Sequence, residues 1–244
     1  MEYTEELQNA NDQFWDMLTE GAILSKGILA VLCCASLFLL VYALIKKIRR
    51  RWESVYYALL CASVLVWSCC SLQAILVPES ADMYAVLRII AIIPIPTLLC
   101  LHVRQQVSYK KQHVGPAVLL FIVSVFLMSV ICRDLFFPLS IPALPLVYEA
   151  EWYSLIFYLY ASIALIRAYM LCFGVFYQMP RRTRRSSRYM LIGISSISIL
   201  FILNALWNGQ LSVLFSKSEI LDVVLPLGAP IAFLIFLYSL YNAL

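Results

Sequence analysis

Arg167 is the residue of this chain whose position most strongly implies a specific chemistry. It lies near the middle of the apolar stretch 153–179, which is long enough to cross a membrane as a helix. An arginine at that depth costs roughly 2.5–17 kcal/mol. Every Asp and Glu lies in a tail, in a loop or at a helix end, so no carboxylate is expected beside it. Backbone carbonyls, polar side chains, water or a bound anion must therefore meet the charge.

A second cation, Arg88, lies one turn into the third apolar stretch from its outer side. Tyr153, Tyr160 and Arg167 are spaced seven residues apart, so they share one face of a helix. This pattern predicts an outward-facing pocket for a small anionic or amphipathic ligand. The residues expected to line it are Arg88, Trp152, Tyr153, Tyr160, Arg167 and Asn204.

An alternative explains Arg167 without a ligand. Its guanidinium could tie neighbouring helices together or reach upward to Glu149, Glu151 or Asp222. His102 is expected at the membrane–water interface, at the inner end of its helix. It has no carboxylate or cysteine partner in register, so no metal site is predicted.

Several kinds of catalytic and cofactor chemistry lack the residues that they need. The last apolar stretch, 223–241, has no lysine for a retinal Schiff base. The His-Glu-x-x-His motif of zinc metalloproteases is absent, and Ser195 has no partnered histidine of the kind an intramembrane serine protease uses. Intramembrane carboxylates, which proton-coupled transporters use, are also missing. We therefore expect no enzymatic activity and no cofactor.

The eight cysteines all fall within the apolar stretches, and no pair has the spacing of a zinc site. We expect them to act as small packing residues between helices. Disulfide bonds are not expected.

Composition and hydropathy define the elements that must hold these residues. The chain is 63% hydrophobic and 13% charged, with a mean hydropathy of +0.87, whereas soluble domains carry about 25% charged residues. These values predict an all-α integral membrane protein, a seven-transmembrane helix bundle. The expected spans are 27–45, 54–77, 83–103, 114–132, 153–179, 189–207 and 223–241.

Charge asymmetry predicts the orientation of the bundle. Thirteen of the eighteen Lys and Arg residues fall in segments 46–51, 104–111 and 181–188, which are alternate connections. Short basic loops stay on the cytoplasmic side, so the N-terminus is expected outside and the C-terminus in the cytoplasm. Segment 1–26 is acidic and extracytoplasmic in this arrangement. It has no features of a signal peptide, so the first span should insert as its own anchor.

The outer connection 133–152 is long and contains Pro138, Pro142 and Pro145 among aromatic and aliphatic residues. This composition excludes a regular helix and disfavours a freely solvated loop. We interpret it as a folded cap over the outer mouth of the bundle. The alternative is a segment lying in the headgroup region of the membrane.

Two spans contain pairs of prolines, which remove backbone hydrogen bonds and predict kinks. Pro94 and Pro96 lie midway along the third span. Pro226 and Pro230 lie early in the seventh span.

Three parts of the chain together resemble a known family. They are the tryptophan-containing run 66–72, the Ile-Pro-Ile-Pro run 93–96, and the stretch 148–206 with its basic loop and Asn204. They are similar to the N-terminal seven-transmembrane sensor region of bacterial histidine kinases and related signalling proteins. Glu149 stands where the family's glycine is expected, so the turn entering the fifth span departs from the pattern.

The resemblance implies a sensor or receptor module that detects an extracytoplasmic ligand or membrane signal and moves its last helix. The sequence stops at Leu244, where a cytoplasmic output domain is expected, so the output is either such a domain or a separate signalling partner. The other expected partners are the lipid bilayer and the ligand, with a homodimer left open and no nucleic acid. The expected location is the cell membrane, as a multi-pass protein of the bacterial cytoplasmic membrane. The alternative function is a small transporter or a non-catalytic accessory subunit of a membrane complex.

Overall fold

The computed structural model describes residues 24–45, 55–107, 115–136, 150–178, 181–207 and 219–243. Nearly all of them are helical. The expected N-terminal segment 1–26 is described only from residue 24, and only the two ends of the expected cap 133–152 are described. Both of these domain assignments remain predictions.

The helices follow one another along the chain without any strand in the described residues. The first helix is described over Leu24–Ile45. It is followed by α2 (Val55–Leu76), the 3-10 helix η1 (Pro78–Ser80), α3 (Ala81–Ile92) and α4 (Pro94–Val107). The second half consists of α5 (Gly115–Phe136), α7 (Ala150–Gln178), α8 (Arg181–Trp207) and α9 (Glu219–Ala243). Because α3 and α4 form one crossing, the described chain has seven helical stretches, which confirms the all-helical prediction.

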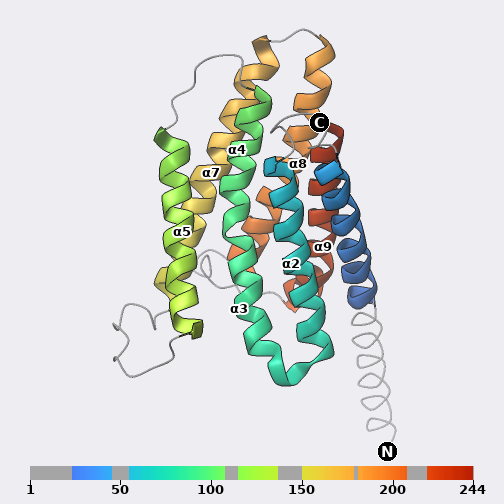
Figure 1. Ribbon diagram of the computed structural model, residues 1–244, viewed down its shortest axis with the longest axis vertical. Coiled ribbons are helices and arrows are strands. Elements are labelled where there is room, and N and C mark those ends of the chain that lie inside the picture. Colours follow the sequence, from blue (N-terminus) through green and yellow to red (C-terminus); the bar gives the residue numbers. More distant parts are fainter. Residues whose placement is uncertain are drawn as a thin grey trace, which may run out of the picture.

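The helices pack into a single bundle around a core of large apolar side chains (Figure 1). α4 packs against α2, α5 and α7, and α8 packs extensively against α9. Fully buried side chains come from most of the crossings. Examples are Leu32, Leu60, Leu99, Ile194 and Phe236.

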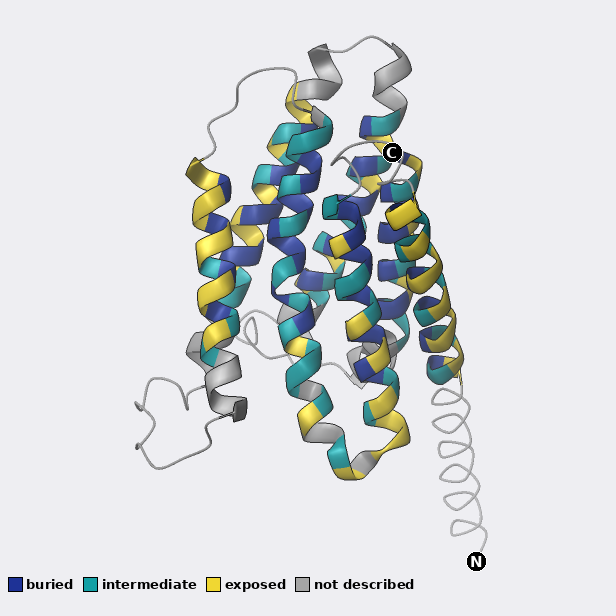
Figure 2. Cartoon of the chain, in the orientation of Figure 1, coloured by how far each residue is buried: buried dark blue, intermediate teal, exposed yellow. Residues whose placement is uncertain are grey.

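The outer surface of the bundle is apolar. Phe38 of the first helix is 69% exposed and Met170 of α7 is 70% exposed, and Figure 2 shows many exposed residues along the outer face of α5. Five helices in the described residues are long and apolar enough to cross a membrane, and Gly115–Val130 and Leu227–Ala243 are shorter apolar helices. A surface of this kind is stable in lipid, where helices satisfy their own backbone hydrogen bonds.

The third crossing is interrupted at Ile93, directly before Pro94. Because Pro94 and Pro96 have no N–H, two carbonyls of the preceding turn lose their usual helical partners. Ile93 nevertheless keeps helical backbone angles (φ −52°, ψ −45°), and its N–H donates to the Ile89 carbonyl at 3.2 Å. The break is therefore local, and the chain keeps its direction from α3 into α4.

The last crossing, α9, continues as one helix through both Pro226 and Pro230. Pro230 is buried in the bundle. A kink at these prolines remains a prediction.

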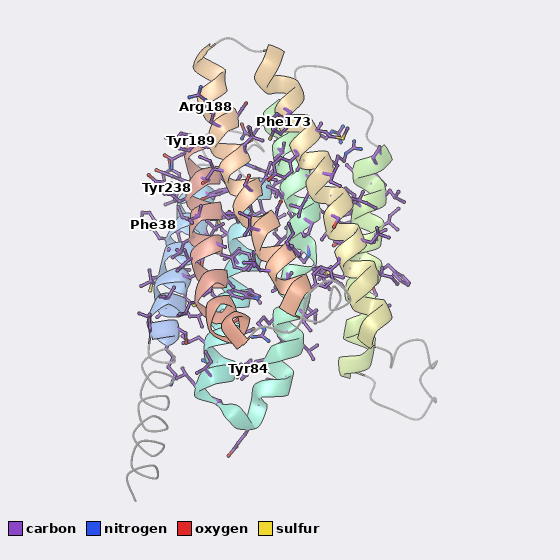
Figure 3. The ribbon with its side chains drawn as sticks, turned by 180° about the vertical axis from the view of Figure 1, so that it is seen from behind. Phe38, Tyr84, Phe173, Arg188, Tyr189 and Tyr238 are labelled. Carbon is purple, nitrogen blue, oxygen red and sulfur yellow. The ribbon has the colours of Figure 1, made fainter. Side chains whose placement is uncertain are left out.

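The two ends of the bundle differ in the segments that they border. The end of the first helix at Ile45, the end of α4 at Val107, the start of α8 and the end of α9 lie at one end of the bundle, which we call the C-terminal end (Figure 1). Figure 3 shows Arg188 near this end and Tyr84 near the opposite end. Two of the three basic segments are described at least in part, residues 104–107 as the end of α4 and residues 181–188 as the start of α8, so the expected basic loop 181–188 is helical. Ile45, which directly precedes the third segment, lies at the same end. That this side faces the cytoplasm remains a prediction.

Candidate functional site

A cluster of buried hydroxyl groups lies beside the break at Ile93. Tyr160 of α7 donates to the Ile93 carbonyl at 3.0 Å, and its oxygen lies 2.5 Å from Oγ1 of Thr97 in α4. Thr97 donates in turn to the carbonyl of Leu120 in α5 at 3.2 Å. Ser124 of α5 also lies within hydrogen-bonding reach of Tyr160. The cluster therefore joins α4, α5 and α7 at the level where the third crossing is interrupted.

Tyr160 is one of the residues expected to line a ligand pocket. In the structure its side chain is 4% exposed, and its hydroxyl is engaged by Ile93 and Thr97. Buried hydroxyls held by such bonds fix neighbouring helices relative to one another. In the structure, Tyr160 therefore links α7 to the third crossing through hydrogen bonds.

The contacts of α7 with the third crossing fix their relative level along the bundle. Tyr160 meets Ile93, and Arg167 lies beside Cys100. Both steps are seven residues long, so α7 and α4 run in the same direction. The same register brings Tyr153 about level with Val86, near the end of the bundle opposite the C-terminal end.

Arg167 is half-buried, and its Nε is buried without a hydrogen-bond partner. Its guanidinium lies beside the Cys100 thiol, and Arg104 lies one turn further along α4. Glu79, in η1 at the opposite end of the bundle, is the one carboxylate among the side chains that the structure describes. No described carboxylate therefore neutralises Arg167.

Arg88 of α3 is also half-buried, but it has different surroundings. It lies near Cys70 of α2. Arg88 precedes Cys100 by twelve residues on the third crossing, which corresponds to about 18 Å along the axis. The structure therefore does not bring Arg88 and Arg167 together in one compact site.

Three other expected pocket residues lie in described helices, although their side chains are outside the described ones. Trp152 and Tyr153 lie in the first turn of α7, and Asn204 lies in the last turn of α8. The ring contact between Phe157 and Phe201, together with the hydrogen bond between Tyr169 and Ser195, shows that α8 runs antiparallel to α7, which brings Asn204 about level with Tyr153. These three positions therefore share the level of Arg88.

Arg88 is connected to the last helix through one turn of α2. Cys70, its neighbour, lies three residues after Trp67 on the same face of α2. The Trp67 ring packs on Phe233 of α9 with ring centroids 4.7 Å apart. All three of these α2 and α9 side chains are buried. Trp67 lies in the tryptophan-containing run that the sequence resemblance used, but nothing in the sequence showed its partner.

The same two helices meet again nearer the C-terminal end. Tyr57 of α2 donates to the Leu237 carbonyl of α9 at 3.2 Å, and its ring lies 6.0 Å from that of His102. His102 is fully buried, and both of its ring nitrogens lack a hydrogen-bond partner. The sequence did not show this burial, which follows from the inward face of α4 carrying the ring into the core. The interfacial depth expected for His102 remains a prediction.

The cysteines form packing contacts between helices. Cys33 of the first helix donates to Ser68 of α2 at 3.2 Å, and its sulfur lies 3.8 Å from that of Cys69. The seven described cysteines are free thiols. Within the described residues, no group of three or more metal-ligating side chains could hold a metal ion.

Comparison with known proteins finds one family. The family model for the N-terminal 7TM region of histidine kinase matches residues 28–243, which is nearly the whole chain. No curated protein and no solved structure matches.

Proposed function

Because the chain belongs to the family of N-terminal seven-transmembrane regions of histidine kinases, we propose that it is a membrane sensor whose last helix carries the signal out. The signal is read at the end of the bundle opposite the C-terminal end. It passes through α2 to α9 and then to a cytoplasmic output domain or signalling partner. The contact of Trp67 with Phe233 is the observation that carries this proposal, since it links the level of Arg88 to α9.

Arg88 is the residue that we propose meets the ligand. Its guanidinium is half-buried, and it forms no ion pair with Glu79, the one described carboxylate, which lies in η1 at the same end of the bundle. A small anionic or amphipathic ligand would supply the missing charge, with Trp152, Tyr153 and Asn204 at the same level as its surroundings. A charge-assisted hydrogen bond to such an anion is worth more than a neutral one, so the bound arrangement of helices is favoured over the free one.

Neutralising Arg88 should change the packing of Trp67. Cys70 and Trp67 are one helical turn apart, so a shift of α2 at Cys70 moves the indole ring against Phe233. Phe233 is 1% exposed and tightly packed, which means that α9 must respond. For a signal to be transmitted, the ligand must stabilise one of the two arrangements.

The test uses the native tryptophans as reporters. The chain is labelled with 5-fluorotryptophan, placed in lipid nanodiscs and followed by fluorine NMR, with resonances assigned by single Trp→Phe variants. We expect the R88Q variant to shift the Trp67 resonance without any ligand, because it removes the same charge that an anion would neutralise. R167Q, which removes a half-buried arginine elsewhere, should leave that resonance in place.

The ligand is probed in the same samples with decanoate, a small amphipathic anion. Decanoate should move the Trp67 and Trp152 resonances in the wild type and in R167Q, but not in R88Q. If R88Q leaves the Trp67 resonance unchanged, Arg88 is not coupled to α9 and the proposed route is wrong. If decanoate acts equally on R88Q, the anion does not bind at Arg88.

A further inference from the structure

Two half-buried arginines lie within about one turn of each other where α4 packs against α7 near the C-terminal end. Arg167 of α7 lies beside Cys100 of α4, and Arg104 lies one turn further along α4. This pair is separate from Arg88 and lies closer to the opposite face of the membrane. The proposed sensing route does not involve it.

The depth of the two arginines matches the edge of the apolar layer. Arg167 lies level with Cys100, which precedes Arg104, the first residue of the basic segment 104–111, by four residues or about 6 Å along the axis. Arg104 lies almost at the end of the stretch Val86–Gln106. Long arginine side chains at this depth extend toward the headgroup region. The two guanidinium groups therefore form a path from the headgroup level into the membrane.

The surroundings of Arg167 open toward lipid. Its neighbours on α7 are Ile163, Ile166 and Met170, which are 52%, 59% and 70% exposed. Acyl chains can lie along these side chains while a headgroup meets the charge. A free aqueous anion would find no such polar approach from this face.

Arg167 has one donor without a partner, although its guanidinium also contacts the Cys100 thiol. Its Nε is buried and makes no hydrogen bond, and no described carboxylate lies at this end of the bundle. A guanidinium presents its N–H groups as a planar fork that matches the oxygens of a phosphate. Basic sites between transmembrane helices bind anionic lipid headgroups by this chemistry.

We propose that Arg167 and Arg104 bind the phosphate of an anionic phospholipid in the leaflet at the C-terminal end of the bundle. The lipid's acyl chains lie on the exposed apolar face of α7. The bound headgroup neutralises Arg167 and holds α4 against α7 on the C-terminal side of the Tyr160 cluster.

The test measures lipid binding to the full chain by native mass spectrometry in detergent. The probes are dioctanoyl phosphatidylglycerol, dioctanoyl phosphatidylcholine and inorganic phosphate. The wild type should bind phosphatidylglycerol about tenfold to a hundredfold more tightly than phosphatidylcholine, as expected for a charge-assisted pair. R167Q should abolish this preference, and R167K, which keeps the charge without the fork, should retain part of it.

R188Q is the matched control, since Arg188 is exposed and lies near the same end of the bundle. It should keep the preference for phosphatidylglycerol. An equal loss in R188Q would show a diffuse charge effect and overturn the site. Displacement of phosphatidylglycerol by inorganic phosphate at equal concentration would assign the site to a free anion, and equal affinity for both lipids would overturn the proposal.

Discussion

The hydroxyl group of Tyr160 lies at the centre of a small network of buried hydrogen bonds that joins three helices. Its oxygen contacts Ile93 and Thr97, and Thr97 extends the chain of bonds to Leu120. The hydroxyl groups of Tyr160 and Thr97 have two protons between them but take part in three contacts. Both side chains are buried. Removing one partner in such a network leaves buried groups unsatisfied, which is more costly than the net value of one hydrogen bond.

The Y160F variant should therefore destabilise the protein by about 1–3 kcal/mol. The measurement is the free energy of unfolding in mixed detergent micelles. Y238F is the control, because Tyr238 is 64% exposed and the same hydroxyl is removed from the lipid-facing surface. Its effect should stay within about 0.5 kcal/mol. A T97V variant should add little to Y160F in a double-mutant cycle, and full additivity would show that the two hydroxyls act independently.

At the scale of helices, α8 and α9 pack closely at Gly193. A Cβ atom at Gly193 of α8 would lie 3.4 Å from the Cβ of Ser239 and 3.5 Å from the Phe236 carbonyl. Ser186 also donates to the carbonyl of Ala243 at 2.6 Å, at the C-terminal end of α9. Small residues at such a contact let two backbones approach each other within a membrane. The two helices should therefore respond to a signal as a unit.

Gly193 provides a test of this pairing. G193L should separate α8 from α9 and destabilise the protein by about 1–3 kcal/mol through overpacking. G193A needs only ordinary contact distances and should have a small effect. The matched control is G174L on α7, where an added Cβ meets nothing within 4 Å. Unfolding in detergent compares the three variants, and equal losses in G193L and G174L would mean that the α8–α9 contact is not specially tight.

At the scale of the molecule, burial varies across the bundle, from its centre to its surface, whereas charge varies along the bundle axis. Burial changes from the centre of the bundle to its apolar outer surface, as lipid requires (Figure 2). Charge changes along the axis, since the helix ends bordering the basic segments gather at the C-terminal end (Figure 1). Membership of a sensor-region family favours a sensor over a transporter or accessory subunit.

The orientation in the membrane can be tested directly. With short basic loops kept in the cytoplasm, a fluorescent protein fused after Leu244 should fold and fluoresce in bacterial cells, while alkaline phosphatase fused at the same point should stay inactive. The control is an alkaline phosphatase fusion within the connection 133–152, which should be active. The reverse pattern would show that the C-terminus lies outside.

The sequence by itself determined the helical class of this protein and its family, because membrane crossing depends on local composition that any apolar stretch reveals. It also predicted a kink at Pro94 and Pro96, since proline removes a backbone donor wherever it stands, and the helix is interrupted directly before Pro94. The sequence did not show which distant side chains are neighbours. In the structure, His102 lies in the core, Tyr160 hydrogen-bonds to a neighbouring helix, and Arg88 and Arg167 are separated along the axis. Only the tertiary structure decided these points, because they depend on which helices are neighbours, how each is rotated and at what level they meet.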